Sequence, residues 1–349
     1  MGSTEGVSSP LQVNSSNPAP MAQPLEKRIF EIREPKNSQI WRELFDFQRE
    51  HNPVYGQWCE LMGFPSHKPA PNHWKEIPFL PISFFKNQRV YASSEPAELQ
   101  FLSSSTTGQG QSLHEVAQAE IYRQAFFSGF HHAWGAPEDW SMLALLPSYM
   151  EREGSSLVYM VEQLMEPAME PKGFFLNDRG VLLERVAEAE GRGLQTMLWG
   201  VSFALLQLAD EYKGPALKHT QIIETGGMKG RGPDLTRAEL HQRLQAAFGP
   251  TPIASEYGMT EMLSQAYSKE NGLFECSPTL EIGIQDPNDP QSWLGPNRSG
   301  RLCIIDYANL YSCSFIATDD LGRLHPDGRF EVLGRMDQAE IRGCNQLAL

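Results

Sequence analysis

The stretch HTQIIETGGMKGRGPDLTRAELHQRLQAAFGPTPIASEYG, residues 219–258, contains a strand, a helix and a second strand in succession. The apolar runs in HTQIIETGG and PIASEYG are short and bounded by glycine or proline, which is typical of strands. Between them, Thr236 and Glu239 have the spacing of a capping box, and Gly249 follows the helix expected over 236–248. A strand–helix–strand unit of this kind favours parallel pairing and predicts an α/β fold.

The same alternation extends towards the N-terminus. SMLALLPSY (141–149) predicts a buried strand, and SSLVYMVEQLM after it predicts a helix. We interpret LLERVAEAE and TMLWGVSFALLQLADEY as further helices, and we expect another helix from Glu115 onward. Residues 25–60 also have a helical pattern of apolar positions. We therefore predict an α/β core over 25–272, with mostly parallel sheets flanked by helices.

The pattern changes at about residue 273. The segments LFECSPTLEIGIQD, SGRLCIIDYA, SCSFIATDD and GRFEVLGRMD read as short strands, and PDG at 326–328 reads as a turn. They predict a small β-rich subdomain over 273–333, followed by a hinge-like tail over 334–349. Residues 1–24 are rich in Ser, Pro, Asn and Gly, so we expect a disordered extension there, with Met21 as an alternative start.

Composition limits the classes of partner. The 349 residues carry a formal net charge of −14, which argues against nucleic acid and anionic membranes. No apolar run is long enough for an integral membrane segment. The five cysteines lack metal-ligand spacing and are few for a disulfide framework, so we expect a reduced, cytoplasmic setting.

Three loops lie at or near the ends of predicted elements, where ligands of parallel sheets gather. FLSSSTTGQGQS (101–112) combines hydroxyls and glycines ahead of a predicted helix, which suits either a phosphate loop or a plain solvated loop. In ETGGMKGRG (224–232), Gly226 and Gly227 permit close approach of a flat ligand or serve a turn. Lys229 in that loop would attract an anion or remain solvated.

The third loop, SEYGMTEM (255–262), offers the most chemistry. Glu261 is a hard oxygen ligand suited to Mg²⁺, Thr260 can donate to a phosphate oxygen, and Tyr257 offers a face for stacking a purine. The alternative is that Tyr257 belongs to the core and that Thr260 and Glu261 start a helix. Likewise, Asp320 in ATDDLGRL would bind a ribose diol or serve a β-turn.

Two further features concern acyl chemistry. Cys344 lies in the tail QAEIRGCNQLAL, where a thiolate would accept an acyl group, or the residue is simply a small buried side chain. An apolar acyl pocket would be lined by aromatic side chains that are otherwise ordinary core. The candidates for this lining are Phe174, Phe175, Trp199 and Phe203.

In order and spacing these motifs resemble the adenylate-forming superfamily of acyl- and aryl-CoA ligases and adenylation domains. SSSTTGQG resembles its phosphate loop, ETGGMKG its Gly-Gly segment, and SEYGMTE its Y-G-x-T-E signature. ATDDLGRL and LGRMDQAEIRG are similar to its ribose and hinge segments. The resemblance implies the large-domain fold of that superfamily, with ATP and Mg²⁺ as cofactors and a carboxylic acid as substrate.

More closely, SYMEREGSSLVYM, ETGGMKGRG and the RGCN ending resemble the acyl-protein synthetase family of bacterial luminescence operons, the LuxE type. That resemblance implies activation of a long-chain fatty acid as acyl-adenylate and its transfer to Cys344, for collection by a partner reductase. It also implies that the mobile C-terminal domain of the superfamily is absent. By resemblance the phosphate loop falls on Ser103, Ser104, Ser105, Thr106, Thr107 and Gly108, and the other nucleotide contacts fall on Gly226, Gly227, Tyr257, Gly258, Thr260, Glu261 with Mg²⁺, Asp320 and Arg335.

The chain departs from the superfamily in three places. Gln111 and Ser112 stand where the phosphate loop often has a lysine, and Asp319 replaces the usual glycine before the ribose aspartate. The catalytic lysine of the C-terminal domain has no counterpart, so charge stabilisation would fall to Mg²⁺, loop amides and Lys229. Two other functions stay open: a ligase that hands the acyl group to coenzyme A, a carrier protein or an amine, and a non-catalytic binding module. A partner protein would be an acyl reductase or an acyl-transferase. An aromatic acid is an alternative substrate.

Overall fold

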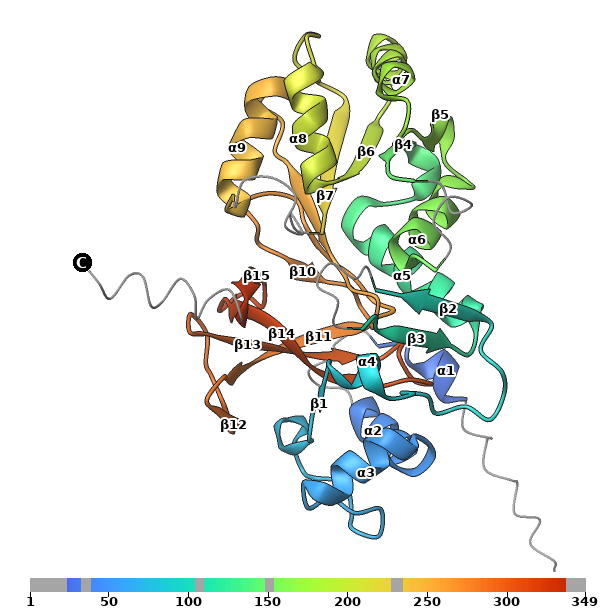
Figure 1. Cartoon of the computed structure of the whole chain (residues 1–349), viewed down its shortest axis with the longest axis vertical. Helices are drawn as coiled ribbons and strands as arrows, with labels where there is room; N and C mark the ends of the chain where they lie inside the picture. Colours follow the sequence, from blue (N-terminus) through green and yellow to red (C-terminus); the bar gives the residue numbers. More distant parts are fainter. Residues whose placement is uncertain (1–23, 33–38, 104–109, 148–153, 227–234, 337–349) are drawn as a thin grey trace, which may run out of the picture.

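The structure is a computed structural model that describes residues 24–32, 39–103, 110–147, 154–226 and 235–336. Within these ranges the chain builds a seven-stranded sheet, a six-stranded sheet and a separate two-stranded hairpin. Figure 1 shows the seven-stranded sheet with its helices in the upper half and the six-stranded sheet below it. This is the mixed α/β architecture expected from the sequence.

The seven-stranded sheet has the order β10-β9-β8-β7-β6-β4-β5, and the strands from β5 to β8 are all parallel. Its helices cover both faces. Apolar residues of α5 and α6 pack on one face, and those of α7, α8 and α9 pack on the other. The bounds are β4 Ser141–Leu145, β5 Met169–Phe174, β6 Thr196–Val201, β7 Thr220–Thr225, β8 Ala254–Tyr257, β9 Ala266–Ser268, β10 Glu275–Cys276, α5 Ala119–Trp134, α6 Ser156–Met165, α7 Arg179–Arg192, α8 Ser202–Glu211 and α9 Arg237–Phe248.

The predicted strand–helix–strand unit is confirmed. Strands β7 and β8 pair in parallel, and α9 connects them. Thr236 caps the helix and forms the full capping box with Glu239, so two otherwise unpaired amides are satisfied. Gly249 ends the helix at a φ of +116°, a value that side-chain-bearing residues rarely adopt.

Two predicted helix positions are wrong. Thr196–Val201 is not helical but forms β6 in the middle of the sheet, because an apolar run buried on both faces reads alike as helix or strand. The helix expected from Glu115 begins at Ala119 instead, and Leu113–Val116 forms strand β3. The hydroxyl-rich segment therefore joins β2 (Leu99–Leu102) to β3 in an antiparallel hairpin, so it does not precede a helix.

The six-stranded sheet follows the order β1-β14-β13-β11-β12, with β15 paired to β14. Most of its strands come from the β-rich C-terminal part, but β1 comes from the N-terminal region and runs parallel to β14. Gln48 on α2 donates to the carbonyls of Asn309 and Leu310, which ties the N-terminal helices to this sheet. The bounds are α1 Leu25–Arg28, α2 Ile40–His51, α3 Pro53–Leu61, α4 Phe84–Asn87, β1 Leu80–Pro81, β11 Leu280–Asp286, β12 Asp289–Trp293, β13 Ser299–Asp306, β14 Phe315–Leu324 and β15 Phe330–Arg335, with two short 3-10 helices at Trp74–Glu76 and Pro137–Asp139.

The two sheets meet at an aromatic cluster. Tyr257, at the end of β8, packs against Phe274 and Phe330, with ring centroids 5.9 and 5.7 Å away. Phe274 and Phe330 exchange both backbone hydrogen bonds, at 2.7 and 3.0 Å. Because this cluster joins the carboxyl end of a parallel strand to the edge of the second sheet, it places loops from both sheets around one seam.

Candidate active site

The seam between the sheets contains a linked tyrosine, aspartate and arginine. The Tyr257 hydroxyl donates to Asp320 Oδ2 at 2.9 Å. Arg335 lies directly across the β14–β15 ladder from Asp320, with Nε 3.8 Å from Oδ1. Three residues from separate parts of the predicted motif set thus form one group in the structure.

Burial governs ionisation in this group. Burial raises the pKa of Asp320, while the hydrogen bond from Tyr257 and the charge of Arg335 oppose that rise. Burial also holds the pKa of Tyr257 well above its ordinary value, helped by the charge of Asp320. The tyrosine therefore stays a hydrogen-bond donor, and the aspartate oxygens are the acceptors that face it. A carboxylate of this kind, 18% exposed, suits a diol.

Glu261 lies near the same seam, in the turn after β8. Its side chain is buried, and burial raises the pKa of its carboxyl. A hydrogen bond with Ser112 and the positive charges of Arg335 and Lys86 oppose that rise. Thr260 and Glu261 form a turn, so the alternative in which they start a helix is wrong.

The two described ends of the hydroxyl-rich segment meet beside Glu261. The Ser112 amide donates to Ser103 Oγ at 2.8 Å, and the Ser103 amide donates to the Ser112 carbonyl at 3.0 Å. Gln111 also donates to the Ser103 carbonyl. Because Ser112 contacts Glu261 as well, the hairpin and the turn after β8 are in direct contact.

The Gly-Gly segment begins at the end of β7, and a charged network buried in the protein supports it. Gly226 has a φ of +67° and its carbonyl accepts from Ser202 Oγ at 2.6 Å. Glu224, two residues earlier, accepts from Ser255 and from Arg237 Nε at 2.7 and 3.0 Å. Burial opposes ionisation of Glu224, but its donors outweigh burial and lower the pKa of this carboxyl.

Arg237 also connects the two sheets. Its guanidinium donates to the Val332 carbonyl of β15 at 3.2 Å and lies over the Phe274 ring, 4.9 Å from the centroid. The base of the Gly-Gly segment and the strand that carries Arg335 are therefore linked through one side chain.

Several predicted residues lie outside the described ranges. Among the described ones, Ser103, Gly226, Tyr257, Gly258, Thr260, Glu261, Asp320 and Arg335 lie in the segments that meet at the seam. The predicted roles of Ser104, Ser105, Thr106, Thr107, Gly108, Gly227, Lys229 and Cys344 stay predictions, because these residues are not described.

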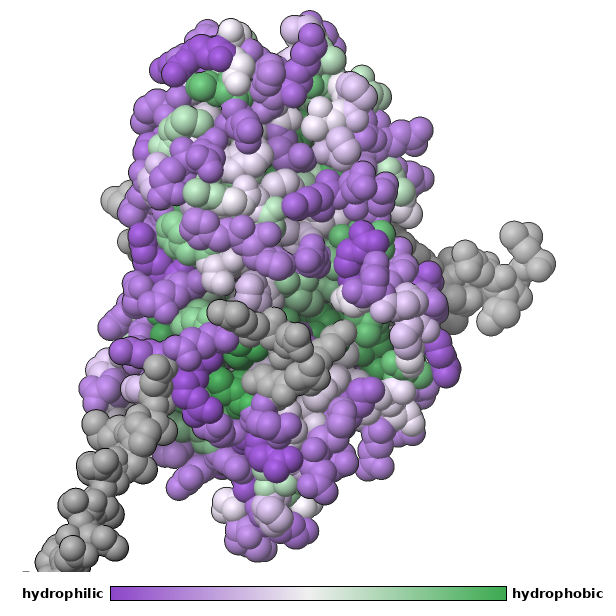
Figure 2. All heavy atoms as spheres, turned by 180° about the vertical axis from the view of Figure 1, so that it is seen from behind, coloured by the Kyte–Doolittle hydropathy of each residue, from purple (hydrophilic) through white to green (hydrophobic). Residues whose placement is uncertain are grey.

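The four aromatic residues suggested for an acyl pocket do not come together. Phe174 and Trp199 pack with the cluster on the α5–α6 face of the sheet, whereas Phe175 and Phe203 pack with the cluster on the α7–α9 face. On the face of the molecule in Figure 2, hydrophobic residues gather in a band at mid-height, the level at which the two sheets meet in Figure 1.

The structure adds site residues that the sequence did not reveal. Glu256 is buried beside Tyr257, accepts from Thr225 Oγ1 at 2.5 Å, and has its pKa raised by burial to about 7. A Cβ at position 258 would lie 2.4 Å from Glu256 Oε1, so a larger residue there would have to displace this carboxyl. His114 and Asn309 contact the Thr260–Glu261 turn. Asn309 lies outside every recognised motif, so nothing in the sequence pattern marked it.

Comparisons with known proteins identify the fold. No protein-family model and no curated protein matches this chain. Among solved structures, 2-hydroxyisobutyryl-CoA ligase with 2-HIB-AMP and CoA, in the thioesterification state, matches with a TM-score of 0.65 and 14% identity, over 89% of this chain and 68% of that one. Its postadenylation state gives 0.63 and 15%, over 92% and 73%. The chain therefore has the large-domain fold of the adenylate-forming ligases.

The first structures matched are longer than this protein. The chain spans 47% of ATP-bound MatB from Rhodopseudomonas palustris, which is 19% identical over 68% of this chain, with a TM-score of 0.49. The likeness to the two 2-hydroxyisobutyryl-CoA ligase structures establishes the fold, and activity has to be argued from the site. No helix in the described ranges is long and apolar enough to cross a membrane.

The donor set at the seam fits a nucleotide and a magnesium ion. Asp320 offers acceptor oxygens, and Ser112 offers a hydroxyl beside Glu261. Arg335 offers a positive charge on a side chain that is 59% exposed. Within the described residues no three His, Cys, Asp or Glu side chains are grouped as a metal site, so Glu261 would act as a single carboxylate ligand. One carboxylate together with substrate phosphates is a usual environment for Mg²⁺.

Proposed function

We propose that this protein is an ATP-dependent acyl-protein synthetase that activates a long-chain fatty acid as acyl-adenylate and transfers the acyl group to its own Cys344. The observation that carries the proposal is the link from Tyr257 through Asp320 to Arg335 at the seam between the sheets. Glu261 and Ser112 lie in contact near this link. These residues belong to separate motifs of the adenylate-forming signature, and the fold is that of the matched ligase.

The residues divide the work between binding and charge neutralisation. Asp320 would accept hydrogen bonds from the ribose, and Tyr257 holds that carboxylate in place. Glu261 would hold Mg²⁺, which supplies positive charge next to the phosphates. Arg335 would place a second positive charge near the nucleotide. Adenylation needs positioning and charge neutralisation more than a general base, so this set of groups suits the reaction.

Two covalent steps follow in order. A carboxylate oxygen of the acid bonds to the α-phosphorus of ATP, the bond from that phosphorus to the bridging oxygen breaks, and pyrophosphate leaves. The Cys344 thiolate then bonds to the acyl carbon, and AMP leaves with the electron pair of the broken acyl–oxygen bond. A thioester formed in this way would be the substrate of a reductase that collects the acyl group as aldehyde.

A second acceptor is favoured by a specific observation. The ligase structures with the same fold contain coenzyme A together with an acyl-adenylate. In this alternative the first step is unchanged, and the thiol of coenzyme A or of a carrier protein replaces Cys344. The two functions differ only in where the acyl group is found after one turnover.

Intact-protein mass spectrometry separates these functions. The protein is incubated with ATP, Mg²⁺ and a mixture of fatty and aromatic acids, beside Cys344→Ala and the matched control Cys276→Ala. An ATP-dependent gain of one acyl mass in the wild type and in Cys276→Ala, absent from Cys344→Ala, is the expected result. Acyl transfer to added coenzyme A at equal rates in all three proteins would instead identify the external-acceptor ligase.

A further inference from the structure

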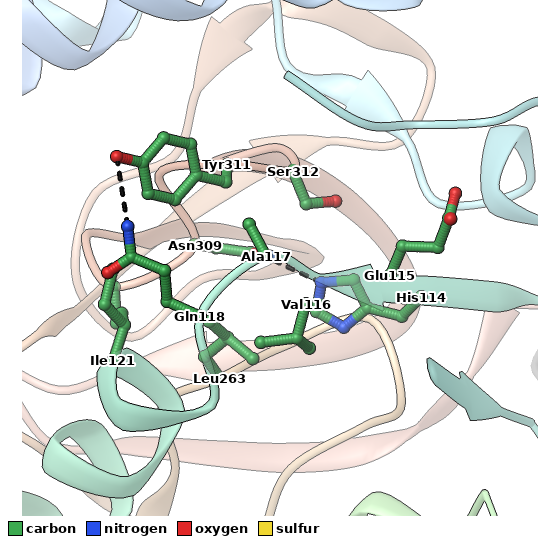
Figure 3. A pocket seen from close by; sticks show the side chains of 11 residues that line it. His114, Glu115, Val116, Ala117, Gln118, Ile121, Leu263, Asn309, Tyr311 and Ser312 are labelled. Atoms are coloured by element: carbon green, nitrogen blue, oxygen red, sulfur yellow. Dashed lines mark hydrogen bonds between the residues drawn. The ribbon is translucent and has the colours of Figure 1, made fainter. Parts of the chain in front are cut away.

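His114 and Asn309 hold two consecutive carbonyl groups of the turn after β8. His114, on β3, is fully buried, with Nδ1 2.7 Å from the Thr260 carbonyl oxygen and Nε2 3.0 Å from Asn309 Oδ1. Asn309 Nδ2 donates to the Glu261 carbonyl at 2.8 Å. Figure 3 shows the imidazole and the amide facing each other, each from a different segment of the chain.

The connection between β13 and β14, which carries Asn309, holds the same turn at a second point. Asp306, the last residue of β13 before this connection, accepts from the amides of Leu263 and Ser264 at 2.7 and 3.0 Å. The Asn309 carbonyl accepts in turn from Gln48 on α2 at 2.9 Å. The backbone from 260 to 264 is thus fixed by side chains of the six-stranded sheet and of β3, and not by ladder bonds of its own.

The ring acts as a neutral hydrogen-bonding group. Burial lowers the pKa of His114 to about 4, although its contacts with Thr260 and Asn309 act in the opposite direction. At neutral pH the ring then carries one proton. The shorter contact assigns this proton to Nδ1, which donates to the Thr260 carbonyl, so Nε2 lies in packing contact with Asn309 Oδ1 without a hydrogen bond. A cavity of about 10 Å³ lies beside the pair, and both His114 and Asn309 line it.

We propose that His114 and Asn309 are positioning residues that fix the Thr260–Glu261 turn in the geometry required for adenylation. The inference rests on the proposed function, since the turn carries the hydroxyl and the carboxylate assigned to phosphate and Mg²⁺. Holding both carbonyls fixes the Cα positions from which these two side chains project. A displacement of about 1 Å at such a site can lower a rate by about 100-fold.

Three variants separate the contacts. His114→Leu removes both ring contacts, whereas His114→Asn keeps an amide donor close to the position of Nδ1. Asn309→Asp preserves shape but presents an acceptor to the Glu261 carbonyl. Asn52→Ala is the matched control, because Asn52 is equally buried and donates to the Ser312 carbonyl of the same connection, without touching the turn.

The readouts are ATP–pyrophosphate exchange with the acid identified by mass, AMP affinity by calorimetry, and urea unfolding. We expect His114→Leu and Asn309→Asp to lower kcat for exchange by about 10- to 100-fold with AMP affinity unchanged. His114→Asn should recover part of that loss. Asn52→Ala should lose stability but keep its kcat. A residue with a merely structural role would not lower kcat while leaving AMP affinity unchanged.

Two results would overturn the proposal. One is a kcat for His114→Leu and Asn309→Asp equal to that of Asn52→Ala at the same folded fraction. The other is a loss of AMP affinity in parallel with kcat. If His114→Leu does not fold, Asn309→Asp and His114→Asn decide by the same measurements. An inactive wild type with every acid tested would reject the proposed function, and the positioning role with it, whereas an active wild type with unaffected variants rejects the positioning role alone.

Discussion

Two buried glutamates on neighbouring strands of one sheet ionise in opposite ways. Glu224 on β7 and Glu256 on β8 are both almost inaccessible to solvent. The register pairs Glu224 with Ser255 and Thr225 with Glu256, so the two carboxyls point to opposite faces of the sheet. The pKa of Glu224 is lowered, and the pKa of Glu256 is raised to about 7.

The two faces differ in their donors. Glu224 faces α9, where Arg237 and His241 offer it a cation and an imidazole, and Ser255 of the neighbouring β8 offers it a hydroxyl. Glu256 faces the apolar cluster of α5 and α6 and accepts from Thr225 alone among the contacts described. Similar burial therefore shifts the pKa values of the two carboxyls in opposite directions, because a buried charge is stable only where hydrogen-bond donors and cations compensate for its lost hydration.

The largest expected effect comes from removing the cation on the α9 face. Arg237→Met leaves the Glu224 carboxylate buried without its charged partner, and we expect the free energy of unfolding at pH 7 to fall by about 3–5 kcal/mol. Urea unfolding measures the loss. The double variant Arg237→Met, Glu224→Gln should recover part of it. A single variant as stable as the wild type would show that the arginine does not set the difference between the faces.

The carboxyl on the other face should make stability fall as pH rises. The folded pKa of Glu256, about 7, lies above its ordinary 4.5, so its contribution is present below pH 4.5 and lost as pH rises through 7. The wild type should match Glu256→Gln at pH 4 and be less stable by about 3 kcal/mol at pH 8. Urea unfolding at both pH values checks this. A difference that does not change with pH would contradict the raised pKa.

The sequence predicts the parts of the molecule in which local signals agree. The sequence predicts the unit from β7 to β8 because its helix begins with a capping box and ends at a glycine. The sequence does not predict the strand Thr196–Val201, since a strand buried on both faces lacks the alternation of apolar and polar residues that would distinguish it from a buried helix. Sequence motifs identify Tyr257 and Asp320 as site residues. Asn309 lies in no motif, and only its tertiary contacts place it beside the site.

A third carboxyl tests how much one neutral donor contributes. Asp320 has the Tyr257 hydroxyl at 2.9 Å and Arg335 at 3.8 Å, which places it between the two glutamates. Tyr257→Phe should lower stability by about 2 kcal/mol at pH 7, because the half-buried Asp320 carboxyl loses the hydroxyl that donates to it. Urea unfolding of Tyr267→Phe is the control, since the buried Tyr267 hydroxyl has no hydrogen-bond partner among the described residues and its removal should cost nothing. Equal losses in both proteins would contradict the assigned role of the hydrogen bond.

The smallest effect concerns the cap that starts α9 next to Arg237. Thr236→Ala removes the acceptor for the Glu239 amide, and we expect a loss of about 1 kcal/mol in urea unfolding. Glu239→Gln should stay near the wild type, because glutamine also completes a capping box. The size of the loss in Thr236→Ala shows whether the cap affects the pairing of Arg237 with Glu224. A value near 1 kcal/mol means that Arg237 keeps its pairing with Glu224 when the cap is gone. A value near that of Arg237→Met means that the cap itself aims the arginine, so the ionisation of Glu224 depends on the first turn of α9.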